Sequence, residues 1–303
     1  MTDSILLLRD FFTKNGIRFQ EKEPLKKHTT FQIGGPCDFM VFPSTSKQIA
    51  AVITECRKHD TPLYFLGKGS DLLVSDDGLP GVVMQLGSSY SKIIVRGNEL
   101  ECEAGASLSA VCYAAYENGL TGLEFAWGIP GSAGGALFMN AGAYGGEIKD
   151  VISGAEHITD EGLTEKRSAD QLCLSYRHSY YSEHPGCCIS KLYFSLKLAP
   201  KEGIKAKMDD LMERRKSKQP LEFASAGSTF KRPPGHYAAA LIEQCGLKGR
   251  SVGDAQVSEK HSGFLINRGN ASCKDVEQLI QIVQEEVEKQ TGCRLECEVR
   301  KLP

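Results

Sequence analysis

The 303-residue sequence lacks long apolar runs and an excess of charge of either sign. No apolar run approaches the roughly 18 to 20 residues that cross a bilayer. The three leucines near the N-terminus have neither a basic leader nor a cleavage site beside them. The 36 Lys and Arg and 38 Asp and Glu leave a net charge of -2. We therefore expect a cytoplasmic protein that binds neither membrane nor nucleic acid, so any anion site must be local.

The eleven cysteines lack the spacing of a metal site or of a disulfide framework. No C-x-x-C pair occurs, and an odd number of cysteines cannot all pair with one another. Cys293 and Cys297 are four residues apart, but no matching group of His or Cys accompanies them. We expect no bound metal and reduced thiols that mostly fill the core, with Cys56 and Cys112 on apolar helix faces.

Glycine, in contrast, is concentrated in residues 122–146, where eight of 25 residues are Gly. Because glycine weakens helices and strands and tolerates positive φ, this stretch is predicted to form neither a stable helix nor a continuous strand. It can instead bring backbone N–H groups close to an anionic ligand. The alternative is a flexible linker, which is disfavoured because Leu123, Phe125 and Trp127 are too apolar for one.

The rest of the chain alternates between short helical and strand patterns, which predicts an α+β protein. Helices are expected at 3–15, after a cap at Ser44 or Ser46, at 107–119, 200–220, 237–245 and 275–290. Strands are expected at 29–33, 38–42, 63–66, 82–86, 93–95, 100–103, 151–158, 192–198 and 295–302.

A second glycine-containing turn follows the strand expected at 63–66. Gly67 and Gly69 free the backbone there, while Lys68 and Ser70 add donors, so the turn is a candidate phosphate site. The sequence is neither G-x-G-x-x-G nor a P-loop, and an ordinary tight turn is the alternative.

The two glycine-containing segments lie in different parts of the chain. Each lies in an α+β half, which suggests one ligand held by both halves. The charged segment 200–220 then leads into a further domain. We place the boundaries at 1–86, 87–203 and 204–303.

Two charged residues are candidates for binding or catalysis. Arg177 follows Tyr176, shortly after the apolar residues Leu172 and Leu174. Its planar guanidinium can bind a carboxylate through two hydrogen bonds. A surface ion pair is the alternative. Glu298 lies in the last expected strand, where its alternative is a solvated pair with Arg300.

Ser228 lies in a turn of small residues beside a local basic cluster of Lys218, Lys231 and Arg232. Without a G-x-S-x-G elbow it is no esterase nucleophile, and its alternative is a turn or cap serine. His261 is expected to be a hydrogen-bonded loop residue rather than a base. The residues alone therefore indicate a nucleotide cofactor site and a third domain, without naming a reaction.

Seven segments in order make the chain resemble the UDP-N-acetylenolpyruvoylglucosamine reductase family: residues 28–36, 65–78, 122–148, 175–181, 218–235, 261–276 and 295–300. This resemblance implies bound FAD, NADPH as co-substrate and a UDP-sugar substrate, in peptidoglycan precursor synthesis. The implied fold has two FAD-binding subdomains of the vanillyl-alcohol oxidase type, followed by an α+β substrate-binding domain. The chain resembles the shorter subclass, because little room for an insertion exists between Arg177 and Lys218.

The resemblance gives Arg177, Ser228 and Glu298 catalytic roles. It implies that hydride passes from reduced flavin N5 to the vinyl carbon, while Arg177 with Glu298 stabilises the resulting enolate. Ser228 would supply the proton, helped by Lys231. The residues expected to bind substrate or nicotinamide are Tyr176, Lys218, Lys231, Arg232 and Asn267. The residues expected to hold FAD are Gly67, Lys68, Gly69, Ser70, Asp71, Gly131, Gly134, Gly135, Asn140, Ala141 and Gly142.

Three positions depart from the pattern of this family. Asp71 stands where Asn is common, Gln32 where a basic residue is frequent, and Arg232 where Asn is frequent. Asp71 brings a carboxylate near a pyrophosphate, which weakens FAD binding unless it accepts hydrogen bonds from its own turn. These departures concern affinity, because none falls on the three catalytic positions.

Two alternative functions remain beside the reductase. One is another FAD oxidase or dehydrogenase of the same fold, acting on an alcohol or sugar. The other is a flavin- or nucleotide-binding module without turnover, which is disfavoured because all three catalytic positions are retained. We expect a monomer in either case.

Overall fold

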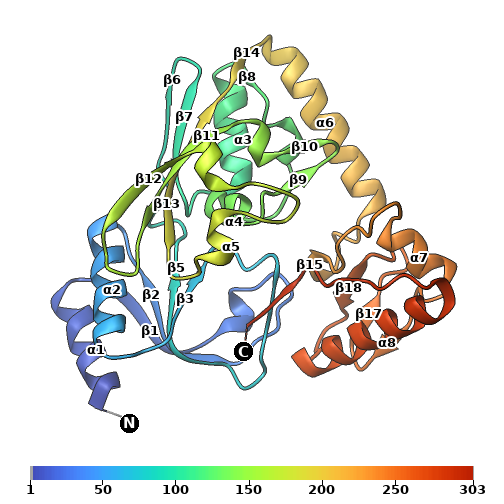
Figure 1. The fold of residues 1–303 in the computed structure, drawn as a ribbon, viewed down its shortest axis with the longest axis horizontal. Helices are drawn as coiled ribbons and strands as arrows, with labels where there is room; N and C mark the ends of the chain where they lie inside the picture. The colour runs from blue at the N-terminus through green and yellow to red at the C-terminus, as the bar shows by residue number, and fades with distance from the viewer. Residues whose placement is uncertain (1–2, 303) are drawn as a thin grey trace. The chain divides into compact units, whose positions relative to one another are not determined.

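The computed structural model describes residues 3–302, which form two compact units (Figure 1). Unit 1 contains residues 3–21, 38–68 and 80–213, and unit 2 contains 22–37, 69–79 and 214–302. Two segments of the predicted first domain, 22–37 and 69–79, thus join the C-terminal part of the chain. The division into three consecutive domains stays a prediction.

Unit 1 is built on two sheets. The first has strand order β1-β2-β5-β3, and the second, antiparallel sheet has order β12-β11-β13-β7-β6. The strands are β1 (Arg18–Pro24), β2 (Pro36–Phe42), β3 (Leu63–Leu66), β5 (Leu79–Gln85), β6 (Ile93–Arg96), β7 (Glu99–Glu103), β11 (Ile152–Ile158), β12 (Thr164–Ser168) and β13 (Cys188–Ser195). Two short pairs complete the unit: β8 (Leu120–Thr121) with β14 (Lys197–Leu198), and β9 (Gly142–Ala143) with β10 (Gly146–Glu147).

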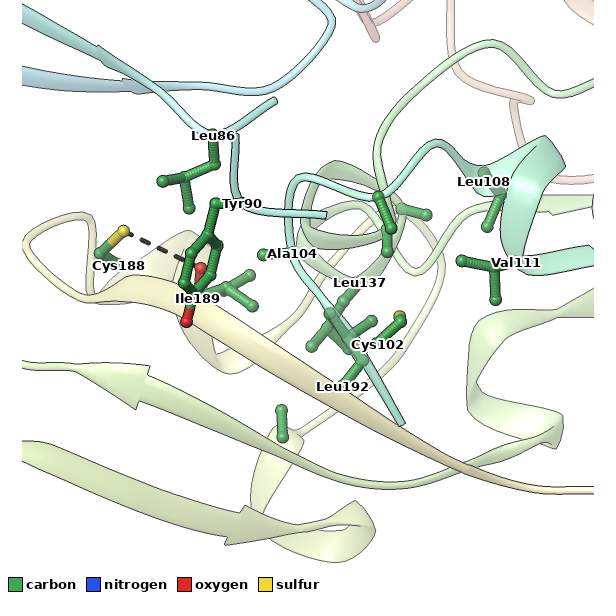
Figure 2. Packing of buried hydrophobic residues seen from close by; sticks show 14 of the residues in the cluster. Leu86, Tyr90, Cys102, Ala104, Leu108, Val111, Leu137, Cys188, Ile189 and Leu192 are labelled. Atoms are coloured by element: carbon green, nitrogen blue, oxygen red, sulfur yellow. Dashed lines mark hydrogen bonds between the residues drawn. The ribbon is translucent and has the colours of Figure 1, made fainter. Parts of the chain in front are cut away.

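The helices of unit 1 bury their apolar faces against these sheets. They are α1 (Asp3–Lys14), α2 (Ser46–Lys58), α3 (Leu108–Glu117), α4 (Ala133–Phe138) and α5 (Tyr180–Glu183), and α6 (Lys201–Lys218) continues into unit 2. Figure 1 shows α1 and α2 along one side of the first sheet. Figure 2 shows Leu137 of α4 among Cys102, Ala104 and Leu192, all members of one buried cluster.

Unit 2 contains a four-stranded antiparallel sheet of order β15-β18-β17-β16. Its elements are β15 (Ala224–Ser228), α7 (Ala238–Gln244), β16 (Ser251–Val252), β17 (Ala255–Val257), β18 (Phe264–Asn267) and α8 (Cys273–Thr291). Helix α8 packs along β16 and β17 and against α7. In addition, β19 (Arg300–Leu302) pairs in parallel with β4 (Leu72–Val74).

Helix ends follow the sequence signals closely. Ser107 accepts a hydrogen bond from Ala110 N at 3.1 Å, and Ser272 forms a capping box with Asp275 at the start of α8. The cap of α2 was wrongly assigned to Ser44 or Ser46, because Thr45 Oγ1 accepts from Gln48 N at 3.2 Å. All eleven cysteines are free thiols, and Cys56 and Cys112 are buried on helix faces as predicted.

Residues 29–33 do not form the predicted strand, although Phe31 and Ile33 are both buried. Gln32 has φ of 57° and turns the chain between them. Thr29 stabilises this loop, because its hydroxyl donates to Ile33 O at 2.9 Å and accepts from Ile33 N at 3.3 Å. The alternation that predicted a strand therefore arises from a loop whose two apolar residues both point into the core.

No helix within residues 3–302 is both long and apolar enough to span a membrane.

A buried histidine gives unit 1 a pH dependence. His157 has no exposed surface; its Nδ1 lies 3.4 Å from the hydroxyl of Tyr181. Burial, and then the charge of Arg167, lower its pKa below the usual 6.5, and Glu165 opposes this only in part. Below that pH the unfolded chain binds a proton that folded His157 does not, so the free energy of unfolding falls.

We expect this loss not to exceed about 1.4 kcal/mol per pH unit below 6.5. Urea titrations at pH 7, 6 and 5 measure it as the difference between the wild type and His157→Gln. The exposed His236 provides the matched control His236→Gln, which should keep the wild-type pH slope. An unchanged slope in His157→Gln would contradict the assignment.

Candidate active site

In unit 1, the start of the 67–71 turn lies against the start of α4. A Cβ atom on Gly67 would lie 2.2 Å from Ser132 Oγ, and Ser132 is the N-cap residue of α4. Gln85 Nε2 donates to Gly67 O at 3.1 Å and holds the turn from β5. The structure therefore brings together the two glycine-containing segments that the sequence singles out.

In unit 2, the remainder of the same turn is fixed by residues far apart in sequence. Thr30 N donates to Gly69 O at 3.0 Å, and a Cβ on Gly69, whose φ is +60°, would lie 2.3 Å from His28 O. Arg300 N donates to Asp71 O at 3.0 Å where β19 joins β4. Backbone hydrogen bonds from Thr30 and Arg300 thus fix residues 69–71 of the turn.

Asp71 does not stand alone as a negative charge. The carboxylate of Asp71 acts on Arg300, where it opposes the desolvation that lowers the pKa of the guanidinium. This interaction of Asp71 with Arg300 was not predicted from sequence, where only the backbone N–H groups of the turn were considered as partners of Asp71. Arg300 was instead considered as a partner of Glu298.

The stretch 122–146 contains more regular structure than its glycine content predicts. Helix α4 includes Gly134 and Gly135, so the expectation that no helix forms there is wrong for these six residues. Gly134 is required because a Cβ would lie 2.8 Å from Ala104 Cβ on the chain after β7. Tertiary packing against β7 and β13 overrides the weak helix propensity of glycine.

The N–H groups of α4 are already engaged. Gly134 N donates to Ala104 O at 2.9 Å, and Gly135 N donates to Ser132 Oγ at 3.2 Å. The predicted FAD contacts of these glycines therefore rest on close approach of the main chain rather than on their N–H groups. Gly131, Ala141 and Gly142 lie in the flanking loops and β9, and their contacts with FAD stay a prediction.

Arg177 lies at the tip of a tight turn in unit 1. Ser175 and His178 form an antiparallel bridge around Tyr176 and Arg177. Arg177 has φ of 55°, and its guanidinium carbon lies 5.0 Å from the centre of the Tyr176 ring. Tyr176 is exposed and Arg177 half-buried, which suits both for contact with a ligand.

Asn140 tethers this turn to the glycine-rich stretch. Its side chain has no exposed surface, and Nδ2 donates to Ser175 O and to Glu147 Oε2, both at 2.9 Å. Oδ1 accepts from Lys149 N at 2.9 Å. Its backbone N–H donates to Leu137 O at 3.0 Å, so these polar groups are used within the protein, and the contact of Asn140 with FAD stays a prediction.

In unit 2, Ser228 and Glu298 lie on adjacent, paired segments. Ser228 ends β15 opposite Phe264 of β18, with an exposed side chain. Beside it, Glu298 N donates to Thr229 O at 2.8 Å, and Phe230 bridges Cys297. Thr30 Oγ1 donates to Ser225 O at 2.7 Å and so connects β15 to the segment that holds Gly69.

The predicted substrate residues of unit 2 have differing environments. Lys218, at the end of α6, is exposed and its charge contributes to the lowered pKa of His261. Lys231 Nζ lies 3.1 Å from Glu296 Oε2, and the guanidinium carbon of Arg232 lies 4.1 Å from the Tyr237 ring centre. Burial is the first cause of the lowered pKa of His261.

Asn267 has a different environment from the one expected of a ligand contact. Its side chain is buried; Nδ2 donates to Phe31 O at 3.0 Å, and Oδ1 accepts from Gly269 N and Ala271 N. The side chain therefore connects β18 to residues 28–36 within unit 2. Its backbone pairs with Ala224 of β15 and Ala255 of β17, and its contact with substrate or nicotinamide stays a prediction.

The residues of the turn suit the pyrophosphate of a dinucleotide. Gly67 and Gly69 leave no room for side chains, so the turn offers main chain, the Ser70 hydroxyl and the exposed Lys68 ammonium. Arg300 offsets the one carboxylate, that of Asp71. Such a surface of donors with compensated charge fits an anionic group.

Comparisons with known proteins agree with this geometry. Residues 37–167 match the FAD binding domain family, and residues 219–302 match the family of the UDP-N-acetylenolpyruvoylglucosamine reductase C-terminal domain. The chain is similar to the UDP-N-acetylenolpyruvoylglucosamine reductase of Clostridium kluyveri, with 48% identity over 98% of this chain and 97% of the relative. The enzyme of Agathobacter rectalis is 49% identical over 92% of each chain.

Solved structures give the same result. The crystal structure of UDP-N-acetylenolpyruvylglucosamine reductase from Thermus caldophilus has a TM-score of 0.81 and 36% identity, covering 95% of this chain and 99% of that one. Berberine bridge enzyme from Eschscholzia californica, with a TM-score of 0.50 and 18% identity over 64% of this chain and 44% of that one, shares the fold alone.

Fold and site together define a flavoprotein oxidoreductase with a two-subdomain FAD-binding fold of the vanillyl-alcohol oxidase type, followed by an α+β domain. Within that class, the chain belongs to the UDP-N-acetylenolpyruvoylglucosamine reductase family. It is of the shorter subclass: between Arg177 and Lys218 the chain forms only α5, β13, β14 and α6.

Proposed function

We propose that this protein reduces UDP-N-acetylenolpyruvoylglucosamine to UDP-N-acetylmuramate with NADPH, as a cytoplasmic monomer in peptidoglycan precursor synthesis. The observation that carries the proposal is the placement of Ser228. Its hydroxyl is exposed at the end of β15, and Glu298, in the chain just before β19, donates its backbone N–H to the carbonyl of the next residue, Thr229. Family membership alone would not put a proton donor on a solvent-facing strand end.

Bound FAD supplies the hydride chemistry, because it can take a hydride from NADPH and pass it to the vinyl carbon. The protein would hold it through the 67–71 turn and the main chain around α4. Arg177 would then face the substrate carboxylate, where its planar fork stabilises the negative charge that builds up in the transition state. Glu298 would act on the substrate as a hydrogen-bond acceptor when ionised or as a donor when protonated.

Ser228 would deliver the proton to the adjacent carbon as a general acid. A serine hydroxyl is a weak acid by itself and needs a neighbouring positive charge. Lys231 is three residues further along the chain. It forms an ion pair with Glu296, whose side chain is largely exposed. Such a pair is worth little, so substrate binding can draw Lys231 away from it.

The remaining residues would bind the UDP part and the nicotinamide. Lys218 is exposed at the end of α6 and suits a diphosphate. Arg232 is also exposed but already stacks on Tyr237. Tyr176, exposed at the tip of the Arg177 turn, suits a ring of the nicotinamide or of the substrate.

The visible spectrum of the purified protein tests the proposal. We expect a yellow protein whose flavin absorbance is bleached by NADPH under anaerobic conditions and restored by the enolpyruvyl sugar nucleotide. Recovery with oxygen and a sugar or alcohol, but not with the enolpyruvyl substrate, would support the oxidase alternative. Absence of bleaching in a flavin-loaded protein would point to a binding module.

A further inference from the structure

The buried side chain of Asn140 is fixed by a dense set of hydrogen bonds. Three of its four possible hydrogen bonds are made, each at 2.9 Å, and the side chain has no exposed surface. Lys149 N can only donate and Ser175 O can only accept, so one orientation of the amide satisfies both. No other natural side chain of this size supplies two donors and one acceptor in this arrangement.

The partners of Asn140 lie on two separate segments of unit 1. Glu147 and Lys149 follow directly after the glycine-rich stretch, whereas Ser175 begins the turn that carries Arg177. A second tie joins the same segments, because Ser179 Oγ donates to Phe138 O at 2.7 Å. The turn is therefore hydrogen-bonded to Asn140 through Ser175, and the residue that follows it, Ser179, is hydrogen-bonded to Phe138.

The backbone around these contacts is strained. Asn140 has φ of 41° and Arg177 has φ of 55°, both in the left-handed region. Such a conformation in an arginine costs free energy and persists only where the surroundings impose it. The hydrogen bond from Asn140 to Ser175 O is one of the contacts that impose it.

Glu147 brings a charge to the same place. Its pKa is lowered by a hydrogen bond from Lys149, and further by Asn140 and the charge of Arg177. Its carboxylate is therefore ionised and acts on Arg177. Lys149 Nζ lies 2.8 Å from the same oxygen that accepts from Asn140.

We propose that Asn140 is a positioning residue for Arg177: its amide fixes both the turn that carries the guanidinium and the carboxylate of Glu147 that faces it. This inference rests on the proposed function, in which Arg177 stabilises charge on the substrate. The side-chain hydrogen bonds of Asn140 all go to protein groups. Its effect on the reaction is transmitted entirely through Arg177.

The test compares Asn140→Asp, Arg177→Lys and the double variant in separate half-reactions. Asn140→Asp keeps the shape of the side chain but loses both donors. We expect its flavin content and flavin reduction by NADPH to stay within about twofold of wild type. Flavin reoxidation by the enolpyruvyl substrate should slow by about ten- to 100-fold, as for a group misplaced by about 1 Å.

The double variant provides the decisive comparison. If Asn140 acts through Arg177, Asn140→Asp should slow Arg177→Lys no further, because residues that act as a unit are not additive. Additive slowing, equal loss in both half-reactions, or an unaffected Asn140→Asp would each overturn the proposal. Normal reoxidation in Arg177→Lys would instead show that the proposed function of Arg177 is wrong.

A second variant applies if Asn140→Asp does not fold. Glu147→Gln changes a half-buried residue and keeps an oxygen that can accept from Asn140 while removing the charge that faces Arg177. We expect slowed reoxidation that is again absent in the Arg177→Lys background. An additive effect of Glu147→Gln would overturn the proposal in the same way.

Discussion

Replacing Ser228 by alanine should leave flavin reduction by NADPH nearly intact and slow flavin reoxidation by the enolpyruvyl substrate at least about 100-fold, the size of a lost general acid. Only the second half-reaction needs a proton at carbon. Ser228 is exposed at the end of β15, and its hydroxyl oxygen is the only group that the substitution removes. Anaerobic stopped-flow measurement of the flavin absorbance follows each half-reaction separately.

Ser225→Ala is the matched control for this experiment. Ser225 lies on the same strand, where its carbonyl accepts from Thr30 and its backbone pairs with Ile266. We expect both half-reactions of this variant to stay close to wild type. Equal losses in the two half-reactions of Ser228→Ala would sink the assignment of Ser228 as proton donor.

Gly134→Val should reduce bound flavin first and turnover only as a consequence. The new Cβ would lie 2.8 Å from Ala104 Cβ, and the rest of the side chain needs still more room. Overpacking of this kind costs about 1 to 3 kcal/mol, which corresponds to roughly five- to 150-fold in affinity if the FAD-bound form carries it. The ratio of flavin to protein absorbance after gel filtration gives the occupancy.

The neighbouring residue separates this effect from a general intolerance of α4 to larger side chains. A Cβ on Gly135 would meet Ser132 Oγ at 3.4 Å, an ordinary contact, and Gly135 is exposed. Gly135→Ala should therefore keep the packing of α4 and a free energy of unfolding close to that of the wild type, and a loss of flavin in this variant would report on contact between FAD and the main chain at Gly135. A Gly134→Val protein with full flavin occupancy but no activity would show that α4 has a catalytic role rather than a cofactor-holding one.

Local signals predicted most of the regular structure. Capping residues and apolar spacing placed α1, α3, α7 and α8 within a few residues of their observed ends. The failures occurred where distant residues decide the conformation: residues 29–33 turn at Gln32, and α4 forms despite two glycines. The edge strand β12 and strand β1 were missed because their exposed, polar sequences lack a strong alternation.

The features of the candidate site also fall into two groups: those marked by local sequence and those that depend on distant residues. The glycine turns, Arg177 and the Ser228–Glu298 pair follow from motif and resemblance, since these depend on residue types in one segment. The hydrogen bond from Asn140 to Ser175 and the electrostatic interaction of Asp71 with Arg300 join residues separated by more than 30 positions. No local pattern marks such partners, so the hydrogen bonds that the buried side chains of Asn140 and Asn267 make within the protein were not predicted.

The pairing of β19 with β4 has a consequence for the biosynthesis of the protein. Leu72–Val74 leave the ribosome long before Arg300–Leu302, and the hydrogen bond from Arg300 to Asp71 cannot form until translation reaches those residues. Contacts so distant in sequence form slowly. The 67–71 turn is therefore completed only at the end of synthesis. With the proposed role of this turn in FAD binding, a nascent chain that has already folded most of unit 1 would not yet hold its flavin tightly.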